Sequence, residues 1–455
     1  MRNVLLSLIL IFLNQILIAQ NQVDSVQPTI DKEKVINWIK QNAVPLKSVQ
    51  AENGFDDLKS FKKVLQNVQV VGLGEATHGT KEFFQMKHRM IEFLIKELGF
   101  NVLTTEFNYI GTKNINNYIL YGKGDAHTAL GSQGLMVWDT EEIIDLIEWL
   151  RKYNQSVQEE KKVSIIGLDI RCNYIGDNFA DIQHFINKVD PQNIARNDSL
   201  LILVKKLDSG IIQGIDTDSC KNEFLKLVAD FSIRRGDFVQ HSSVEEYTDI
   251  FKRLIIIGQN LCMNYVKMDD ARELYYEKTR LRDYYMASNL MSLVQDEKPG
   301  TKVIVWGHNM HISKADPKET GDIRMFGNFL KEAYGDKYFT FGFSFDKGNF
   351  QTFEYSDDRK PLGMQEFTVS ADHVNTIDWY FSKTGINPFV INFRINNMPD
   401  FMKDFLNTSL LTRRIGGEAI RSTVEMMNGF CTINKSYDAM IFINKTTRAI
   451  PIRFE

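Results

Sequence analysis

Two short glycine-containing segments of this 455-residue chain combine a histidine with a glutamate or with a second histidine three residues away. The segment Gly-Glu-Ala-Thr-His-Gly places Glu75 three residues before His78, and the segment Gly-His-Asn-Met-His places His308 three residues before His311. An imidazole with a pKa near its unperturbed value of about 6.5 is partly neutral at physiological pH. His78 can therefore act as a general base that takes a proton from water.

The other residues of these segments suit the remaining parts of a hydrolytic reaction. Glu75, or Glu106 from the end of a neighbouring predicted strand, can fix the tautomer of the base and hold the attacking water. His308 and His311 can donate hydrogen bonds to a developing oxyanion. Further charged and polar residues near these segments are expected to bind substrate, and they are Lys87, Arg89, Arg282, Asn309 and Asp169.

Four apolar, β-rich runs precede these residues along the chain. The predicted strands cover residues 68–73, 102–106, 163–168 and 302–306, and helical patterns cover residues 80–98 and 140–153. Strands separated by helices of this length favour a parallel sheet with helices on both faces. Each run delivers a carboxylate or an imidazole at its carboxyl end, which is the edge where open α/β sheets form ligand crevices.

The rest of the chain predicts one domain with a helical insertion. Residues 193–297 carry little strand signal and long helical patterns, whereas strand signals return at residues 338–344, 389–393 and 440–443. We expect an α/β fold for residues 21–455, with a mainly parallel central sheet flanked by helices and with residues 193–297 as a helical cap or insertion.

The N-terminus is typical of a secretory signal peptide. Arg2 precedes an apolar stretch at residues 4–18, and a polar run follows Gln20. The stretch is too short and too interrupted for a confident membrane span. We expect residues 1–20 to be removed near Ala19 or Gln20, which would leave an exported periplasmic or secreted protein without a stable membrane span.

Composition and missing motifs exclude several classes of protein. The chain is 43% hydrophobic and 25% charged with a net charge of −4, and it has no concentrated basic segment, so a nucleic-acid partner is not expected. It contains no Gly-x-Ser-x-Gly, His-Glu-x-x-His or Cys-x-x-Cys motif and no matching nucleotide-binding glycine loop. The expected partner is a small-molecule ester or lactone.

Two other hypotheses use the same residues. Glutamate and histidine side chains have suitable chemistry for a zinc or manganese ion, so a metal-dependent hydrolase is the first alternative to a cofactor-free enzyme, with the ligand set Glu75, His78, Glu106, His308 and His311. A non-catalytic small-molecule-binding protein is the second alternative, because such a protein would keep the crevice without the chemistry.

At these residues the chain resembles the erythromycin esterase family. The resemblance begins at the Gly-Glu-Ala-Thr-His-Gly segment and continues in order through nearly the whole mature chain, which is more specific than one short motif. The matching positions are Glu75, His78, residues 87–90, Glu106, Trp138, residues 140–142, residues 167–169, Arg282, Asp283, Met286, Asn289, residues 307–311, residues 438–441 and residues 446–447.

The resemblance implies hydrolysis of an ester, in the named members a macrolide lactone, by water rather than by a covalent nucleophile. His78 falls at the general base of the family and Glu75 and Glu106 at acidic positions around it. Lys87 falls where some macrolide-cleaving members carry Arg, which keeps the charge but loses the bidentate fork. The family is usually described as needing no metal.

Overall fold

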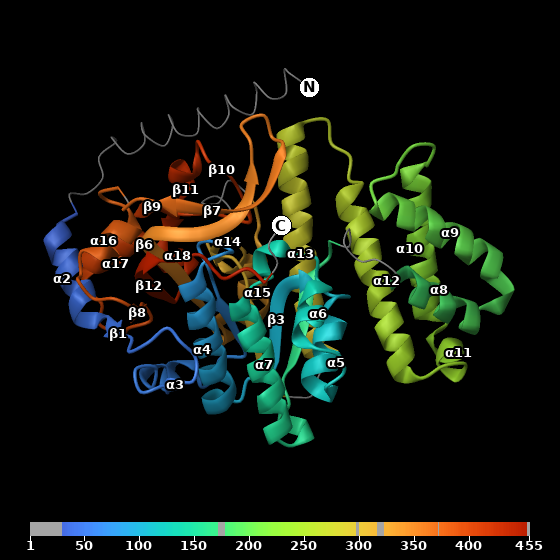
Figure 1. The fold of residues 1–455 in the computed structure, drawn as a ribbon, viewed down its shortest axis with the longest axis horizontal. Coiled ribbons are helices and arrows are strands. Elements are labelled where there is room, and N and C mark those ends of the chain that lie inside the picture. Colours follow the sequence, from blue (N-terminus) through green and yellow to red (C-terminus); the bar gives the residue numbers. More distant parts are fainter. Residues whose placement is uncertain (1–29, 172–177, 297–299, 316–322, 372, 453–455) are drawn as a thin grey trace.

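A central sheet with helices on both faces forms the body of the computed structural model, which describes residues 30–171, 178–296, 300–315, 323–371 and 373–452 (Figure 1). The strand order is β1-β8-β12-β6-β2-β5-β3-β4, and β7 and β10 also pair with β6. These strands are β1 (Val44–Pro45), β2 (Val70–Leu73), β3 (Val102–Asn108), β4 (Ser164–Asp169), β5 (Val303–Trp306), β6 (Tyr338–Tyr355), β7 (Pro361–Val369), β8 (Phe389–Asn392), β10 (Glu418–Ile420) and β12 (Ala439–Thr446).

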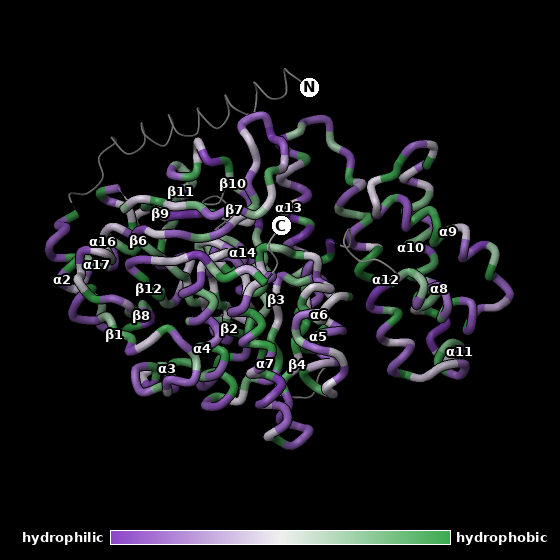
Figure 2. The backbone as a smooth tube through the Cα atoms, viewed as in Figure 1, coloured by the Kyte–Doolittle hydropathy of each residue, from purple (hydrophilic) through white to green (hydrophobic). Residues whose placement is uncertain are grey.

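The middle of the sheet is parallel. Strands β12, β6, β2, β5, β3 and β4 run in the same direction, whereas β8 is antiparallel to β12 and β7 is antiparallel to β6. A separate antiparallel pair joins β9 (Ser409–Arg413) to β11 (Asn428–Thr432). The central strands are almost fully buried because helices cover both faces, and Figure 2 shows apolar residues gathered along them.

Two hydrophobic cores lie on opposite faces of the sheet. The first packs against α3 (Ser60–Leu65), α4 (Lys81–Leu98), α5 (Thr112–Tyr121), α6 (Ala126–Gly131) and α7 (Glu141–Ser156). The second packs against α2 (Lys32–Asn42), α13 (Ala271–Asp296), α14 (Asn309–Ile312), α15 (Phe326–Tyr334), α16 (Ile377–Ser382), α17 (Asp400–Asn407) and α18 (Ile433–Ser436).

A third core belongs to a helical lobe at one side of the sheet (Figure 1). Its helices are α8 (Asn178–Val189), α9 (Ile194–Asp208), α10 (Thr217–Ile233), α11 (Arg235–Gln240) and α12 (Val244–Asn264). Helix α13 connects the lobe to the sheet because it contacts α12 as well as β4 and α15. The described residues between β4 and β5 contain helices and no strand.

The predicted fold class is confirmed, since every predicted strand lies in the sheet and β2, β3, β4 and β5 are parallel neighbours. Strand β6 extends eleven residues beyond the predicted end at Ser344, because its second half forms a hairpin with β7. The predicted signal peptide at residues 1–20 lies outside the described residues. Within the described ranges, no helix combines the length and the apolar character that crossing a bilayer requires.

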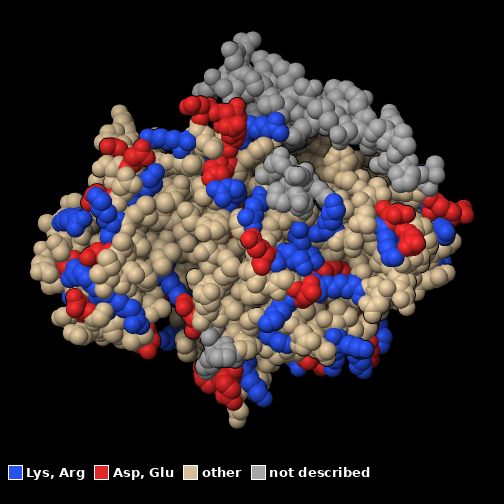
Figure 3. Space-filling model, turned by 180° about the vertical axis from the view of Figure 1, so that it is seen from behind, with Lys and Arg blue, Asp and Glu red and all other residues tan. Residues whose placement is uncertain are grey.

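Charged side chains on the face shown in Figure 3 are interspersed, with Lys and Arg next to Asp and Glu. Exposed ion pairs of the described residues include Arg280 with Glu277 and Lys226 with Glu223.

Candidate active site

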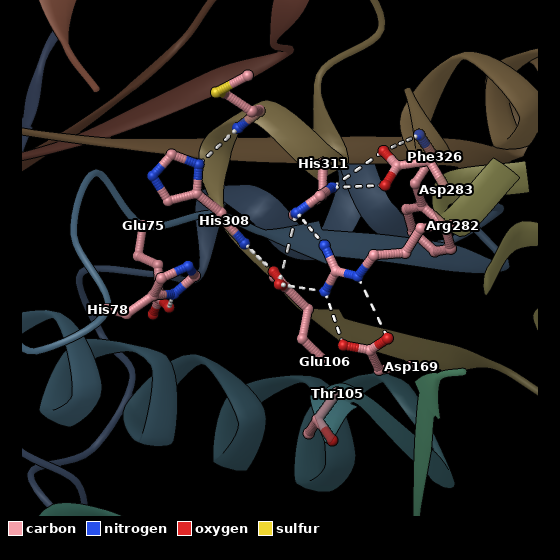
Figure 4. Close-up of polar contacts among 12 residues, drawn as sticks. Glu75, His78, Thr105, Glu106, Asp169, Arg282, Asp283, His308, His311 and Phe326 are labelled. Atoms are coloured by element: carbon pink, nitrogen blue, oxygen red, sulfur yellow. Dashed lines mark hydrogen bonds and ion pairs between the residues drawn. The ribbon is translucent and has the colours of Figure 1, made fainter. Parts of the chain in front are cut away.

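The strand order places the predicted catalytic residues together. Glu75 follows β2, His308 follows β5 and Glu106 lies near the end of β3, and β5 lies between β2 and β3 in the sheet. The backbone N–H of Asn309 donates to the carbonyl oxygen of Glu75 at 2.9 Å, and that of His308 donates to Oε1 of Glu106 at 2.5 Å. The segment after β5 therefore bridges the two carboxylate-bearing strands (Figure 4).

Glu106 lies at a β-bulge. Thr105 pairs with Gly167 and Asn108 pairs with Asp169, so β3 carries one residue more than β4 between these pairs. A bulge turns a side chain away from the regular alternation of a strand. A Cβ atom on Gly167 would lie 2.3 Å from the carbonyl oxygen of Phe107, so the bulged backbone requires glycine at that position.

Glu75 and His78 form a buried histidine–carboxylate dyad. Oε1 of Glu75 lies 2.6 Å from Nδ1 of His78, and Oε2 accepts hydrogen bonds from Nζ of Lys87 at 2.6 Å and from Nε1 of Trp306 at 3.1 Å. A carboxylate only accepts hydrogen bonds, so Nδ1 of His78 carries the proton. Nε2 then holds a lone pair and has no hydrogen-bond partner among the described residues.

Two rings contact the imidazole of His78. The rings of Trp138 and His308 each lie 5.0 Å from it, and a tenth of the His78 side chain is exposed. Nε1 of Trp138 is buried and has no hydrogen-bond partner among the described residues. The dyad thus has a free base atom on an imidazole that two other rings contact, and one of these rings carries an unused indole donor.

Lys87 lies behind the dyad. Its ammonium group is fully buried, donates to Glu75 and to the carbonyl oxygen of Gly307, and lies 4.4 Å from the ring centre of Trp306. Burial lowers the pKa of Lys87 to about 8, although the Glu75 carboxylate opposes this shift. The structure therefore differs from the expectation that Lys87 contacts substrate, because its contacts are with Glu75 and the strand ends.

A second charged cluster lies at the ends of β3 and β4 (Figure 4). Arg282 of α13 donates from Nε and Nη2 to the two carboxylate oxygens of Asp169 at 3.2 and 2.8 Å, and Nη2 lies 3.3 Å from Oε2 of Glu106. Nη1 of Arg282 lies 3.0 Å from Nε2 of His311, and Oε2 of Glu106 lies 3.5 Å from the same atom. Glu106, Asp169, Arg282 and His311 are thus brought together as predicted site residues.

The charges of this cluster hold one another ionised. Burial by itself would raise the pKa of Glu106, but His311, His78, Arg282 and the backbone N–H of His308 together hold it well below its ordinary range. Burial would likewise raise the pKa of Asp169, which Arg171 and Arg282 hold well below its ordinary range. The pKa of Arg282 is raised in return, since Asp169 and Glu106 outweigh the effect of burial.

His308 is held in one neutral form. Its Nδ1 accepts a hydrogen bond from the backbone N–H of Met310 at 3.2 Å, so the proton sits on Nε2, which donates to the carbonyl oxygen of Ile415 at 3.2 Å. Burial and the neighbouring His78 place the pKa of His308 well below its ordinary value. Both ring nitrogens are engaged, so His308 forms a wall beside His78 and caps α14.

Arg89 and Asn309 lie outside the polar site, in contrast to the expected substrate contacts. Arg89 is fully buried and binds Asp57, together with the carbonyl oxygens of Ser48 and Gly54. The Asn309 amide exchanges two hydrogen bonds with the backbone of Phe343 at 2.7 and 3.0 Å. Both side chains have a structural role, because their polar groups form hydrogen bonds with segments that are distant in the sequence.

Replacing Arg89 with lysine is expected to lower stability without lowering turnover. The variant loses the fork that binds Asp57, and hydrogen bonds to charged groups contribute about 1–3 kcal/mol. Urea unfolding measures this loss, and steady-state kinetics are expected to give a kcat/KM within about twofold of the wild type because no site residue contacts Arg89. A large rise in KM would instead place Arg89 at the substrate.

Acid is expected to unfold the protein partly through Glu106 and Asp169. Because their folded pKa values lie below the unfolded values of about 4.5 and 3.8, their stabilisation is present above those values and is lost as the pH falls through and below them. The free energy of unfolding, measured by urea denaturation, is therefore expected to fall less steeply between pH 5 and pH 3 in Glu106→Gln than in the wild type. Glu159→Gln, at an exposed carboxylate, serves as the control, and equal slopes for both variants would contradict the prediction.

Several neighbours of these side chains could not be identified from the sequence. Trp306 is the last residue of a buried strand, and its position in the sequence predicts a core residue. Its indole N–H nevertheless donates a hydrogen bond to Glu75. The carbonyl oxygen of Ile415 comes from a distant loop, and a backbone acceptor leaves no trace in residue type. Asp283 is adjacent to Arg282 on a helix and reads equally well as a surface ion pair, although its side chain is fully buried against His311.

A metal ion would have to displace present partners. Lys87 occupies one oxygen of Glu75, the N–H of His308 occupies one oxygen of Glu106, and both ring nitrogens of His308 are engaged. In the part of the chain that the structure describes, no group of three or more His, Cys, Asp or Glu side chains is arranged to hold a metal.

Comparisons with known proteins identify the family of the chain and proteins of similar fold. The family model described as erythromycin esterase matches residues 95–446. An erythromycin esterase type II from Escherichia coli is 24% identical over 391 residues, which is 81% of this chain and 91% of that protein. A solved Bacillus cereus protein covers 93% of this chain and all of its own with a TM-score of 0.79 at 24% identity. A solved erythromycin esterase mutant in its open conformation covers 90% of this chain and 99% of its own with a TM-score of 0.68 at 15% identity.

Proposed function

The chain belongs to the erythromycin esterase family of hydrolases, and we propose that it cleaves an ester or lactone by adding a water molecule that His78 activates. The observation that carries this proposal is the Glu75–His78 dyad, in which Nδ1 is tied to a carboxylate and Nε2 is left open. A base with this arrangement keeps one tautomer and takes up a proton at one atom.

The proposed reaction begins when Nε2 of His78 takes a proton from water. The water oxygen forms a bond to the carbonyl carbon, and the carbonyl oxygen becomes an oxyanion. Glu75 stabilises the imidazolium that results, because its carboxylate accepts the Nδ1–H at 2.6 Å. The bond between the carbonyl carbon and the ester oxygen then breaks, and the products are a carboxylic acid and an alcohol.

Positive charge for the oxyanion comes from the Arg282 and His311 side of the site. Lys87 is enclosed behind Glu75, and the Nε2–H of His308 is already donated to Ile415. Arg282 instead keeps 14% of its side chain exposed while it is held in place by Asp169. Preorganised donors of this kind act strongly because they do not have to reorient during the reaction.

A macrolide lactone is the substrate class that we propose to test first. Supporting observations are the erythromycin esterase relatives and the ring of Trp138 beside His78. The buried indole N–H of Trp138 has no hydrogen-bond partner among the described residues. We further propose that the protein acts after export, on the basis of the apolar stretch at residues 4–18, which lies outside the described residues.

The proposed function is tested by mass spectrometry of mature protein with a panel of macrolides and simpler esters, each with and without a chelator. We expect a substrate to gain the mass of one water, unaffected by chelator. Turnover of simple esters without turnover of any macrolide would limit the proposal to esterase activity. Loss of activity to chelator, restored by one divalent ion, would favour the metal-dependent alternative.

A further inference from the structure

Asp283 of α13 is a fully buried carboxylate that the proposed reaction does not yet use. Both of its carboxylate oxygens lie 2.9 Å from Nδ1 of His311, and Oδ2 also accepts the backbone N–H of Phe326 at 2.7 Å. Figure 4 shows these contacts on the side of the site opposite Glu75 and His78. The site therefore contains two histidine–carboxylate dyads, Glu75–His78 and Asp283–His311.

The contacts of His311 define which of its nitrogens exchanges a proton. Because Asp283 accepts a hydrogen bond from Nδ1, that nitrogen keeps its hydrogen, and Nε2 is the atom that gains and loses one. A protonated Nε2 forms an ion pair with Oε2 of Glu106, which lies 3.5 Å away, whereas a deprotonated Nε2 accepts a hydrogen bond from Nη1 of Arg282 at 3.0 Å. Each protonation state of His311 thus has its own partner.

The surrounding charges favour the protonated state before reaction. Three carboxylates, those of Glu106, Asp169 and Asp283, face two guanidinium groups, those of Arg171 and Arg282, so a positive charge on His311 completes the balance. Burial lowers the pKa of His311, but the Asp283 and Glu106 carboxylates outweigh that effect and raise it overall, against Arg282. His311 is consequently suited to begin the reaction as an acid.

From this geometry we infer that the Asp283–His311 dyad supplies the proton to the leaving alcohol, with Asp283 as the positioning residue that acts through His311. The inference rests on the proposed hydrolysis and adds the acid that this reaction needs. It also names esters of alkyl alcohols as the substrate class of the site. An alkoxide is a poor leaving group, so such esters need an acid that protonates the ester oxygen as the bond breaks.

The proton balance closes over one turnover. As the bond between the carbonyl carbon and the ester oxygen breaks, its electron pair goes to the ester oxygen, which takes the proton from Nε2 of His311. The freed lone pair of Nε2 then accepts a hydrogen bond from Arg282. His78 ends with the proton of the attacking water, and exchange with solvent removes it and returns one to His311.

The test compares an alkyl ester with a p-nitrophenyl ester of the same acid, using the mature protein and the variant Asp283→Asn. p-Nitrophenolate leaves without a proton, so a defect in proton delivery affects the alkyl ester more. We expect the kcat of Asp283→Asn to fall by about 10–100-fold for the alkyl ester and by a much smaller factor for the aryl ester. A structural role of Asp283 would lower both rates by the same factor.

Two further measurements separate positioning from packing. The alkaline limb of the kcat–pH profile for the alkyl ester is expected to move to lower pH in Asp283→Asn, because the variant lacks the carboxylate that keeps His311 protonated. The double variant Asp283→Asn/His311→Gln is expected to be no slower than His311→Gln, since the two residues act as one unit. Additive losses would contradict the inference.

Controls distinguish failure of this inference from failure of the proposed function. Asp57→Asn, at a buried carboxylate bound to Arg89, is expected to change both ester rates by the same factor. If His78→Ala abolishes both hydrolyses while Asp283→Asn slows both equally, the proposed function stands and the inference is overturned. If His78→Ala leaves both rates unchanged, the proposed function itself is overturned.

Discussion

Replacing His78 with alanine is expected to lower the kcat of ester hydrolysis by about 10²–10⁴-fold, because general-base catalysis by a positioned side chain contributes a factor of this size. The Nε2 atom of His78 is the open base of the site, and its Nδ1 partner Glu75 remains in place through Lys87 and Trp306. Rate measurements on any substrate found in the mass-spectrometric panel check this result.

The matched control for this prediction is His127→Ala, because His127 lies on the exposed surface of α6. Circular dichroism and thermal unfolding establish that both variants keep the fold. The kcat of Glu75→Gln is expected to lie between those of the wild type and His78→Ala. The amide can still form a hydrogen bond with His78, but it lacks the charge that stabilises the imidazolium. Undiminished turnover by a folded His78→Ala protein would contradict the proposed role of the dyad.

Replacing Lys87 with methionine is expected to lower the free energy of unfolding at pH 7 by roughly 3–5 kcal/mol, because removing one partner of a buried pair leaves the other charge uncompensated. Both side chains of the Lys87–Glu75 pair are fully buried. Urea denaturation followed by tryptophan fluorescence measures the loss.

The double variant Glu75→Gln/Lys87→Met is expected to regain most of that stability without regaining the turnover of the wild type. Burial lowers the pKa of Lys87 to about 8 even though Glu75 opposes the shift, so keeping the ammonium group charged inside the protein is costly. Replacing a buried ion pair by uncharged groups of similar size is often neutral for stability. A double variant as unstable as Lys87→Met would show that the lysine contributes through packing rather than by neutralising Glu75.

Local patterns were sufficient for the elements that carry the site. The apolar runs before Glu75, Glu106, Asp169 and His308 predicted β2, β3, β4 and β5, and the helical pattern after His78 predicted α4. These predictions hold because buried parallel strands are continuously apolar. In helices that pack one face against the sheet, apolar residues recur about every 3.6 residues. Because each acid or histidine comes at the end of its strand in the sequence, it was expected at the carboxyl edge of the sheet.

Patterns of residue type could not separate substrate contacts from structural ones. Lys87 and Arg89 are two residues apart on α4 and both are fully buried, yet one binds Glu75 of the dyad and the other binds Asp57 in the loop before α3. Residues at this spacing point in different directions from a helix, and what each meets depends on segments far away in sequence. The same holds for Asn309, whose amide meets the backbone of β6.

The sequence by itself determined which groups can do chemistry and at which edge of the sheet they lie, because strand direction and hydrophobic periodicity are local properties. Only the tertiary structure decided their partners. The insertion of β5 between β2 and β3 brings His308 against Glu106, and the packing of α13 on β4 brings Arg282 and Asp283 to Asp169 and His311. The order of the strands and the packing of the helices depend on burial summed over the whole chain. They determine which charged group lies beside which, and the hydrogen bonds that result fix the tautomer of each histidine.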